Sequence, residues 1–359
     1  MTALAVAGLS LRLGAFTLGD LSFTLAANEI LVVLGPNGAG KSVMLETIAG
    51  FHRPARGRIL IGGRDVTALP PEQRRVGFLV QNFGLFSHLT VAQNVALAAK
   101  ARRGVEDGHR VPNVTQLLER FGIAHLTDAS PLVLSPGEKQ RTALARAEAS
   151  HPDLFLLDEP FSALDTKARD ELRTELGRFL REVHASALFV THDYIDVAAL
   201  GDRVAVMHDG KIIQLGTIAE VFRRPSNRIA ADILGIENLL NGQVETGNGR
   251  LLCIVVAGAT FHAEIADGTA LTGEVCVAVR AEDVRLARSG HGRAATLDNR
   301  LAGKVIALQP LGALTKVTLD CGFRLVASLM TRDVAELGLF PGAAAVAVIP
   351  VADVHVLAP

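Results

Sequence analysis

The sequence predicts an α/β domain followed by a smaller all-β domain. In the first two thirds, short apolar runs rich in β-branched residues alternate with helical patterns, and three runs end in polar residues (Ile30–Leu34, Leu154–Leu157 and Leu188–Val190). Such runs are typical of buried parallel strands, whose carboxyl ends carry the ligands of α/β proteins. After about Gly235, short alternating strands separated by Gly, Asn and Asp replace the helices. We therefore place the two domains at residues 1–235 and 236–359.

Length and composition limit the possible functions. The 359 residues, of which 49% are hydrophobic and 20% charged, are enough for two or three globular domains. A net charge of −1 gives no basic excess, so we expect no nucleic-acid partner. Three widely spaced cysteines without a CxxC motif indicate reduced thiols rather than a metal site: Cys253, Cys276 and Cys321.

No segment is typical of a secretory signal or of a membrane-spanning helix. Residues Met1–Ser10 lack the basic and apolar blocks of a signal peptide. The longest charge-free apolar stretch near the C-terminus, Leu337–Ala352, is shorter than the ~20 residues that a span needs, and it contains two glycines and two prolines. Any role at a membrane therefore requires docking to another subunit.

The β region contains a weak internal repeat. Asn238–Val244 (NLLNGQV) recurs as Asn299–Val305 (NRLAGKV). Each copy later reaches a matching strand, Val275–Leu286 or Ala345–Val356, and the two strands share an Asp-Val pair. This pattern predicts two related, small barrel-like modules that pack side by side, at about residues 236–290 and 295–359.

The segment Gly35–Ser42 (GPNGAGKS) has the pattern GxxxxGK[ST] between a predicted strand and a helical pattern at Val43–Ala49. Its glycines allow consecutive backbone N–H groups to face phosphate oxygens, and the helix adds its positive N-terminal end. Lys41 would neutralise the β- and γ-phosphates, and the Ser42 hydroxyl would coordinate Mg²⁺. A glycine-rich turn with a solvated lysine is disfavoured by this context. The predicted phosphate-binding residues are Gly35, Pro36, Asn37, Gly38, Ala39, Gly40, Lys41 and Ser42.

Two adjacent carboxylates, Asp158 and Glu159, end the buried run at Leu154–Leu157. Such a pair at a dry strand end needs a compensating cation, which Mg²⁺ supplies. We expect Asp158 to hold the metal and Glu159 to polarise an attacking water. An ordinary strand cap is the alternative, and the neighbouring phosphate loop disfavours it.

Residues Leu134–Arg141 (LSPGEKQR) lie just upstream of the Asp158 strand. They resemble the LSGGQ signature of the ABC ATPases, with Pro136 in place of the first glycine. Ser135 as N-cap and Pro136 in the first turn predict a helix start. The resemblance implies that Ser135 and Gly137 contact phosphate.

Other elements of the ABC family follow in the family's order, and the resemblance covers about residues 3–235. Gln81, in VGFLVQ, matches the glutamine that senses Mg²⁺ and the γ-phosphate. Asp165, in the segment SALD, matches the loop that crosses the dimer interface, and His192, in FVTHD, matches the switch histidine at the γ-phosphate. Phe16 falls where the family places an aromatic ring that stacks on adenine. Taken alone, Phe16 is more typical of a core position and His192 of a structural one.

The resemblance implies that ATP and Mg²⁺ bind between two subunits, with the phosphate loop of one facing the signature of the other. Because a single chain carries one of each, we expect a homodimer that closes on ATP and reopens after hydrolysis. In that dimer Glu159 acts as a base or positions water, His192 stabilises the charge of the γ-phosphate, and Gln81 senses the metal.

The β region makes the chain similar to the ATP-binding subunits of binding-protein-dependent ABC importers. This similarity implies permease partners in the membrane, an indirect role for an extracytoplasmic substrate-binding protein, and a peripheral position on the cytoplasmic face of the inner membrane. In the family, the stretch after Gln81 forms part of a groove for a short permease helix. The candidates here are Phe83, Leu85 and Phe86, with local core packing as the alternative.

The segments Gly40–Gly50 and Leu69–Arg74 look most like the molybdate/tungstate importer subunits, as does Gly312–Ala327 in the β region. The leading hypothesis is therefore an ATPase that energises uptake of molybdate or tungstate. Importers of iron(III), sulfate, polyamines or sugars share the architecture. A non-transport regulatory ABC ATPase would carry a second cassette or a basic arm, which this sequence lacks, and an oxyanion sensor with a degenerate ATPase is disfavoured by the intact motifs.

The second β module departs from molybdate-binding modules, which usually begin with Ser-Ala-Arg-Asn and carry a lysine near the last strand. This chain has Thr296–Asn299 (TLDN) and Pro350 at the corresponding positions. Asp298 would repel an oxyanion, and Pro350 supplies neither a charge nor a donor. We therefore predict that this module serves dimerisation or regulation and does not bind molybdate in that way.

Overall fold

The described part of the chain divides into two compact units, Met1–Val221 and Phe222–Pro359. The structure is a computed structural model and describes residues 1–101, 113–162, 164–248, 251–264, 272–288 and 298–357. The division precedes the expected limit at residue 235, because α8 (Arg228–Ile233) lies against β11 (Asn238–Asn248) and β14 (Gly273–Val279) of the second unit. Within these described ranges, no helix is both long and apolar enough to cross a membrane.

The first unit is built on a six-stranded sheet in the order β10-β9-β3-β8-β7-β6. Strands β9, β3, β8, β7 and β6 run parallel to one another, and β10 runs antiparallel to β9. Every residue of β3, β7 and β8 is buried, which confirms the three central strands expected from the sequence. The bounds are β3 (Ile30–Leu34), β6 (Val76–Leu79), β7 (Leu154–Asp158), β8 (Ala187–Thr191), β9 (Arg203–His208) and β10 (Lys211–Thr217).

The register of this sheet brings four strand ends to one edge. Leu34 of β3 pairs with Thr191 of β8, and Asp158 of β7 pairs with Val190. On the next strand, Leu79 of β6 pairs with Leu157. The residues that follow these strands therefore meet at a single edge, as ligand-binding residues do in parallel sheets.

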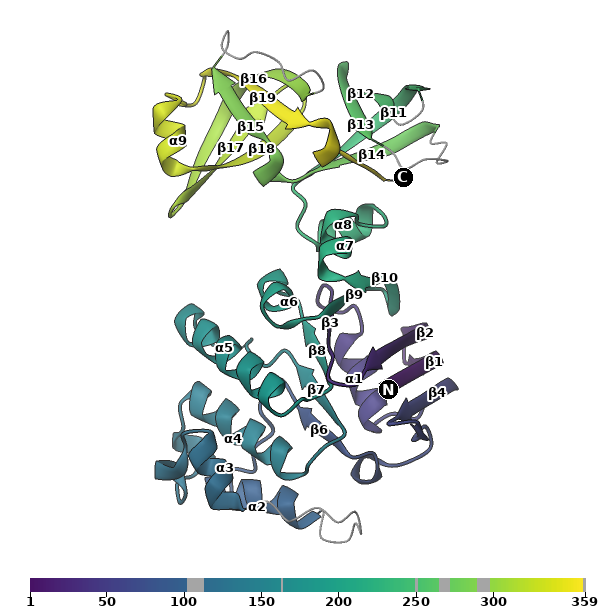
Figure 1. The fold of residues 1–359 in the computed structure, drawn as a ribbon, viewed down its shortest axis with the longest axis vertical. Helices are drawn as coiled ribbons and strands as arrows, with labels where there is room; N and C mark the ends of the chain where they lie inside the picture. The colour runs from purple at the N-terminus through teal and green to yellow at the C-terminus, as the bar shows by residue number, and fades with distance from the viewer. Residues whose placement is uncertain (102–112, 163, 249–250, 265–271, 289–297, 358–359) are drawn as a thin grey trace. The chain divides into compact units, whose positions relative to one another are not determined.

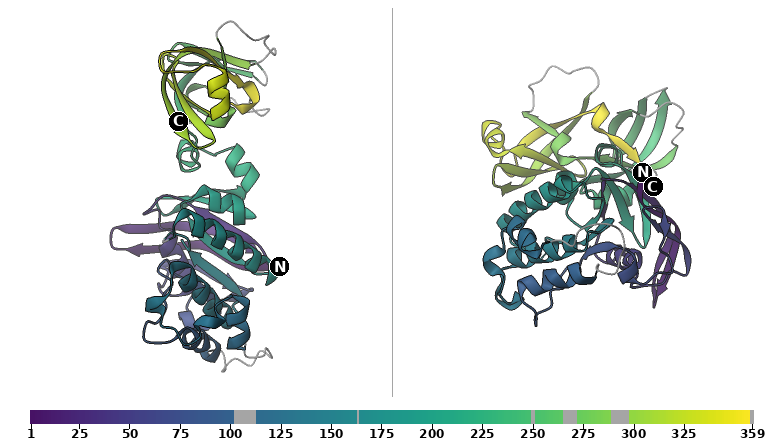
Figure 2. Two further views of the ribbon diagram at one scale, coloured as in Figure 1. Left: turned by 90° about the vertical axis from the view of Figure 1, so that its left-hand side faces the viewer. Right: turned by 60° about the horizontal axis from the view of Figure 1, so that its bottom comes forward.

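A second, antiparallel sheet of the same unit has the order β2-β1-β4-β5. Its apolar face forms one core with α1 (Lys41–Ala49) and with residues of the six-stranded sheet. Figure 1 shows α1 between these antiparallel strands and the central sheet, with the longer helices on the other side, and Figure 2 shows the same separation. The bounds are β1 (Thr2–Leu13), β2 (Phe16–Ala26), β4 (Arg56–Ile61) and β5 (Arg64–Asp65).

The C-terminal end of α1 is held by Arg74, which ends the segment Leu69–Arg74 and is only 2% exposed. Its guanidinium donates hydrogen bonds to four carbonyl oxygens, at distances of 2.8–3.0 Å: those of Thr47, Ile48, Thr67 and Leu69. The first two belong to the last turn of α1, where a cation complements the helix dipole. Burial lowers the pKa of Arg74.

Helices α2 (Val91–Ala101), α3 (Val114–Arg120) and α4 (Pro136–Ala149) share a small core of their own. Helix α4 begins with the predicted cap, because Ser135 and Glu138 form a reciprocal capping box and Pro136 occupies the first turn. Helix α5 (Thr166–Glu182) follows β7, and α6 (Tyr194–Leu200) follows β8. The short α7 (Ile218–Arg223) follows β10.

The second unit consists of two five-stranded sheets. The last strand of each repeat lies in the sheet that is formed mainly by the other repeat. Their orders are β13-β12-β11-β14-β20 and β15-β19-β16-β17-β18. The remaining bounds are β12 (Leu251–Val256), β13 (Ala259–Glu264), β15 (Arg285–Arg288), β16 (Asp298–Leu311), β17 (Leu314–Asp320), β18 (Arg324–Met330), α9 (Thr331–Glu336), β19 (Ala344–Pro350) and β20 (His355–Leu357). Each run that we expected as one strand is thus two strands in different sheets, joined by a 3₁₀ turn at Ala281–Asp283 or Val351–Asp353.

The two asparagines that open the repeats make equivalent contacts across the sheets. Asn238 is buried, donates to the carbonyls of Val279 and Val326, and accepts from the Val326 amide. Asn299 is also buried, donates to the carbonyls of His262 and Ile349, and accepts from the His262 amide. Each repeat therefore clamps a strand that belongs to the other.

The unusual positions of the second module lie together. Asp298 and Pro350 face each other as paired residues of β16 and β19. Thr296, at the start of the segment Thr296–Asn299, lies outside the described residues. The local pair therefore combines an acidic side chain with a residue that has no N–H donor.

Candidate nucleotide-binding site

The loop Gly35–Ser42 joins β3 to α1, as the sequence predicts. Gly40 caps the helix in the left-handed region, with φ +98°. A Cβ atom at Gly40 would lie 2.3 Å from Cζ of Phe16, and one at Gly35 would lie 2.3 Å from the carbonyl oxygen of Met207. Glycine is therefore required at both positions, and the ring of Phe16 packs directly against the loop.

A pocket opens beside this loop and collects residues from four separate segments. Phe16 comes from the start of β2, Gln81 follows β6, and Glu159 follows β7. The loop and α1 supply Asn37, Gly38, Gly40, Lys41, Ser42 and Val43. Phe16 is half-buried and lines the pocket, so it is not simply a core residue. Val43 was not among the predicted site residues, because an apolar side chain inside a helix gives no chemical signal.

Lys41 is buried at the base of this pocket, with 5% exposure. Its Nζ atom donates to the carbonyl oxygens of Gly35 at 2.8 Å and Pro36 at 3.0 Å, and lies 3.5 Å from Oε1 of Glu159. Burial lowers the pKa of Lys41, and the charge of Glu159 opposes this shift. The ammonium group is thus held where it can pass from carbonyl oxygens to phosphate oxygens.

Ser42 and Asp158 form a pair of oxygen donors at the start of α1 and the end of β7. The Ser42 hydroxyl donates to Oδ1 of Asp158 at 3.0 Å. Burial raises the pKa of Asp158, and the charges of Glu159 and Glu46 add to this, although the hydrogen bond from Ser42 opposes it. A hydroxyl and a carboxylate are hard oxygen ligands, so this pair fits Mg²⁺.

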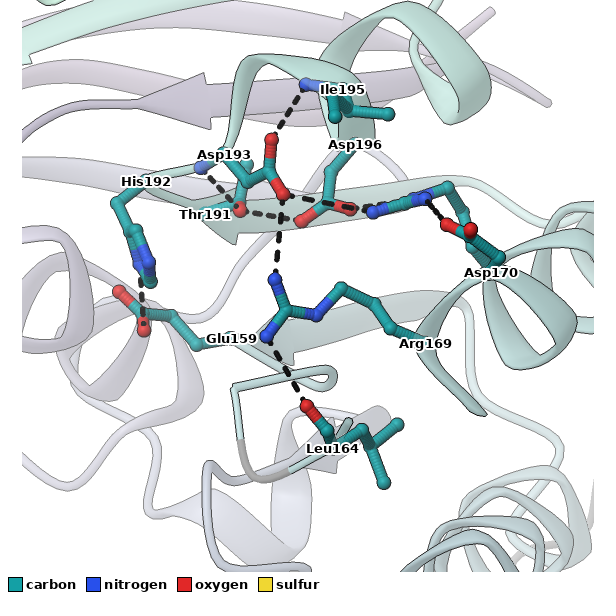
Figure 3. Close-up of polar contacts among 10 residues, drawn as sticks. Glu159, Leu164, Arg169, Asp170, Thr191, His192, Asp193, Ile195 and Asp196 are labelled. Atoms are coloured by element: carbon teal, nitrogen blue, oxygen red, sulfur yellow. Dashed lines mark hydrogen bonds and ion pairs between the residues drawn. The ribbon is translucent and has the colours of Figure 1, made fainter. Parts of the chain in front are cut away.

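Glu159 links the loop to the histidine after β8. Its Oε1 faces Lys41, and its Oε2 lies 3.1 Å from Nδ1 of His192 (Figure 3). The Glu159 backbone has φ +43°, an uncommon conformation for a non-glycine residue, and its amide donates to the carbonyl of Val190. Strained backbone of this kind often occurs at functional sites. The side chain of His192 is half exposed.

The structure brings together most, but not all, of the predicted site residues. Asp158 and His192 join the pocket residues through their contacts with Ser42 and Glu159. Ser135, Gly137 and Asp165 are not among the described residues that line the pocket. Ser135 caps α4, and Asp165 caps α5 by accepting from the Ala168 amide at 3.0 Å. Ala163, in the predicted segment SALD, lies outside the described residues.

A separate, mainly apolar groove lies between α2, α4 and β6. Its lining includes Phe51, Phe78, Val80, Phe86, Leu97 and Arg146. Phe86 is 42% exposed, whereas Phe83 is buried and Leu85 is half-buried, and neither of these two lines the groove. Of the three candidate partner contacts, Phe86 alone is therefore on this surface, because Phe83 turns into the core.

Two polar side chains, the buried Asn94 and the half-buried Arg146, hold the backbone near Phe86. Asn94 of α2 accepts from the Phe86 amide at 2.8 Å and donates to the Phe86 carbonyl at 3.1 Å. Arg146 of α4 donates to the carbonyls of Phe83 and Gly84, and its guanidinium lies 5.7 Å from the centre of the Phe86 ring. The exposed ring is thus presented by a fixed backbone. Neither Asn94 nor Arg146 could be singled out from the sequence, because a single polar residue in a helical pattern is typical of a solvent-facing position.

Comparison with known proteins identifies the family. Residues 18–162 match the family described as ABC transporter, and residues 295–356 match the TOBE domain. The chain is 37% identical over 342 residues to the molybdate/tungstate import ATP-binding protein WtpC of Pyrococcus horikoshii, and this match covers 95% of the chain and 96% of that protein. The chain belongs to the ABC transporter family. As an ATP-binding subunit of this family, it is an ATP hydrolase coupled to import.

Two further matches cover less of this ABC subunit. The sulfate/thiosulfate import ATP-binding protein CysA of Mycobacterium bovis is 42% identical over 243 residues, which are 67% of the chain and 69% of that protein. A solved structure, described as a dimeric post-hydrolysis state of the ATP-binding cassette MJ0796 bound to ADP and Pi, matches with a TM-score of 0.52 and 28% identity. That match covers 60% of the chain and 98% of the solved chain. The expected ABC fold with a β-rich C-terminal region is thereby confirmed.

Proposed function

We propose that this ABC subunit hydrolyses MgATP to drive the uptake of molybdate or tungstate through a partner permease. The observation that carries the choice of solute is the extent of the similarity to the molybdate/tungstate protein WtpC, which covers 95% of the chain and so includes the β region. Similarity to the sulfate/thiosulfate protein CysA covers 67%. The β region is the part in which importers of one architecture can differ. The WtpC match spans it more fully than the CysA match or the 79% match to the spermidine/putrescine import ATP-binding protein PotA of Mesorhizobium japonicum, which favours molybdate or tungstate.

Uptake by cells tests the choice of solute. Cells that lack this gene should accumulate less molybdenum at low external molybdate, and the wild-type gene should restore accumulation while a gene with Lys41→Ala should not. Sulfate uptake in the same cells is the matched control. Loss of sulfate uptake with unchanged molybdate uptake would contradict the proposal and favour the sulfate alternative.

In the proposed mechanism, the residues around the phosphate loop bind and orient ATP. The backbone of Gly35–Ser42 faces the phosphates, Lys41 moves from the carbonyls of its own loop to the β- and γ-phosphates, and Phe16 stacks on adenine. Ser42, Asp158 and Gln81 supply oxygen atoms for Mg²⁺, which neutralises charge on the phosphates when bound. The hydrogen bond between Ser42 and Asp158 supports this assignment, because it already brings two of these ligands together.

Hydrolysis itself is assigned to Glu159 and His192. Glu159 accepts a proton from the attacking water or orients it, and His192 stabilises the charge of the γ-phosphate. Their contact of 3.1 Å supports a shared task. We expect Glu159→Gln to lower kcat by about 100-fold, while ATP affinity stays within about twofold of the wild type. ATPase assays and nucleotide titrations measure the two effects, and wild-type turnover would remove Glu159 from this role.

We further propose that two copies of the chain form the complete ATP sites, with Ser135 and Gly137 of one copy facing the phosphate loop of the other. Their absence from the described lining of the pocket in their own chain is consistent with this arrangement. The segment with Asp165 would lie at the same interface. In the Glu159→Gln background, ATP should convert monomers to dimers in size-exclusion chromatography, and Gly137→Asp should prevent this. Dimers that form equally well with Gly137→Asp would contradict the assignment.

The groove around Phe86 is the proposed docking site for the permease, which would hold the subunit on the cytoplasmic face of the membrane. Its occupant would be a short amphipathic helix, because the groove is mainly apolar and displays Phe51, Phe86 and Leu97. The substrate-binding protein would then act through the permease. Phe86→Asp should leave the ATPase activity of the isolated subunit unchanged but prevent co-purification with the permease. Ile229→Asp, at an exposed apolar residue outside the groove, is the matched control.

The second β module is proposed to act in dimerisation or regulation rather than as a molybdate site. The pairing of Asp298 with Pro350 supports this, because an oxyanion there would meet a carboxylate and a residue without a donor. We expect that no part of the second β module binds molybdate in that way. Measuring molybdate binding to the full chain tests this expectation. Saturable binding that Asp298→Arg leaves unchanged would place a molybdate site elsewhere in the chain.

A further inference from the structure

The residues on both sides of His192 are tied to helix α5 by ion pairs, of which the Arg173–Asp196 pair is buried and the Arg169–Asp193 pair is partly exposed (Figure 3). Thr191, which precedes the histidine, donates from Oγ1 to Oδ2 of Asp196 at 2.7 Å. The other oxygen of Asp196 accepts from Nε of Arg173 at 2.7 Å. Thr191, Asp196 and Arg173 are 3%, 4% and 6% exposed, so this connection is shielded from water.

Asp193, which follows His192, makes the second connection. Its Oδ1 accepts from the Ile195 amide at 2.8 Å and caps α6, and its own amide donates to Oγ1 of Thr191 at 3.0 Å. Its Oδ2 lies 3.6 Å from Arg173 and 3.7 Å from Arg169. One carboxylate thus fixes the local turn with one oxygen and faces two guanidinium groups with the other.

Arg169 continues this connection to the segment before α5. Besides facing Asp193, it donates to the carbonyl oxygen of Leu164 at 3.3 Å. Asp165, next to Leu164, is the N-cap of the helix that carries both arginines. The side chain of Arg169 therefore contacts both Leu164 and Asp193. A displacement of Leu164 and Asp165 would move Arg169 and, with it, its contact with Asp193.

This arrangement is better suited to positioning than to stability. Buried ion pairs contribute little net stability compared with apolar contacts, because both charges lose their hydration, but they restrict the geometry of the groups they join. The His192 side chain is half exposed and contacts Glu159, so its orientation depends on the backbone at Thr191 and Asp193. Those are the two residues that the arginines hold through carboxylates.

We propose that Arg169 and Arg173 are positioning residues that align His192 with Glu159 according to the placement of Leu164 and Asp165. The inference deepens the proposed function, because it rests on the assignment of His192 to the γ-phosphate and of Asp165 to the interface between copies. Closure of the two copies fixes Leu164 and Asp165, and Arg169 transfers that placement to the turn that carries His192. Hydrolysis is thereby linked to correct assembly of the interface.

The test is a double-mutant cycle with ATPase turnover as the readout. Arg169→Gln should lower kcat about tenfold in the wild-type background, with little change in ATP affinity, because misplacement of a catalytic group slows chemistry more than binding. In the His192→Ala background the same substitution should have no further effect. Arg178→Gln, at an exposed position of the same helix, is the matched control and should leave kcat unchanged.

A second variant separates positioning from folding. Asp193→Asn keeps an N-cap side chain for α6 but removes the charge that faces the arginines. It should reproduce the loss of kcat with an unchanged melting temperature, and combining it with Arg169→Gln should cause no additional loss. Equal losses from Arg169→Gln with and without His192, or multiplied losses in the double variant, would overturn the inference. Wild-type turnover of His192→Ala would instead overturn the proposed role of the histidine, and the inference with it.

Discussion

The hydroxyl of Ser42 donates a hydrogen bond to the carboxylate of Asp158, with 3.0 Å between Oγ and Oδ1. The two residues are 116 positions apart in the sequence and meet because β3 and β7 end at the same edge of the sheet. The phosphate loop and the end of β7 are therefore already joined by the two side chains assigned to the metal. These two oxygen atoms would hold Mg²⁺, which would supply positive charge to neutralise the phosphates.

This pair predicts a selective effect of Ser42→Ala. The variant should lose about tenfold in affinity for MgATP, because one ligand that orients the metal is absent, while its affinity for ATP in the presence of EDTA should remain unchanged. Isothermal titration calorimetry under both conditions measures the difference. Ser42→Thr keeps the hydroxyl and should behave as the wild type. An equal loss with and without Mg²⁺ would show that Ser42 contacts only the phosphates.

The raised pKa of Asp158 predicts a pH dependence. Because burial makes the folded-state pKa higher than the ordinary value of 3.8, the folded protein binds this proton more tightly than the unfolded chain does. The contribution of Asp158 to the free energy of unfolding is therefore greatest below 3.8 and is lost as the pH rises through the raised pKa. Mg²⁺ requires the ionised form, so metal-dependent ATP affinity should fall as the pH decreases through the same range.

Asp158→Asn provides the comparison for both effects. Urea unfolding at a series of pH values measures the free energy of unfolding of the wild type and of this variant. The difference between the two values should vary between pH 3.8 and the raised pKa of Asp158 and should be constant above that pKa. A difference that does not change with pH would mean that Asp158 has an ordinary pKa in the folded protein.

The four carbonyl contacts of Arg74 predict a large loss of stability on substitution. Arg74→Met should lower the free energy of unfolding by about 3 kcal/mol, because buried carbonyl oxygens at the end of α1 would lose their donors. Denaturant unfolding of the full chain measures this change. Arg58→Met, at an exposed position of β4, should change stability by less than about 0.5 kcal/mol. Similar values for the two variants would contradict this account of Arg74.

The paired asparagines of the second unit predict effects that cross from one repeat to the other. Asn238→Ala should speed hydrogen exchange at the Val326 amide by about tenfold or more, because that amide loses its acceptor. Asn299→Ala should do the same at the His262 amide. Hydrogen exchange followed by mass spectrometry on the full chain distinguishes the two, and each variant is the control for the other. Exchange that increases only within the mutated repeat would contradict the reciprocal clamp.

The sequence was sufficient to predict the three central strands of the sheet and the phosphate loop, since both leave strong local signals. The runs at Ile30–Leu34 and Leu154–Leu157 are apolar throughout because they are buried on both faces, and the loop needs glycines at fixed positions. The order of the later motifs then indicated which residues meet at the sheet edge. The roles of those residues remain predictions that the experiments above address.

Other features depend on long-range packing and left no comparable signal. Alternation in Val275–Leu286 indicates which side chains face inward but not which strand lies alongside, so the exchange of β15 and β20 was not foreseen. The segment after Gln81 is irregular and therefore has no helical or strand periodicity. The sequence pattern could not show which of its apolar side chains are buried and which are exposed. The structure separates buried Phe83 from exposed Phe86. Arg74 formed part of a recognised segment, but only the fold shows why an arginine stands there.

The exchange of β15 and β20 between the repeats determines which residues must stay together when the second unit is fused to, or recombined with, another protein. A segment that begins at residue 295, where the match to the TOBE domain starts, leaves β15 behind and carries a β20 whose partner strand, β14, is missing. On one side of this cut β19 would lose its partner β15, and on the other side β14 would lose its partner β20. Each of the two fragments would then have an unpaired strand edge, which favours aggregation. A recombination event or a gene fusion therefore preserves the fold only when it transfers both repeats together. In this respect the two repeats form a single domain, although each has the length of a separate module.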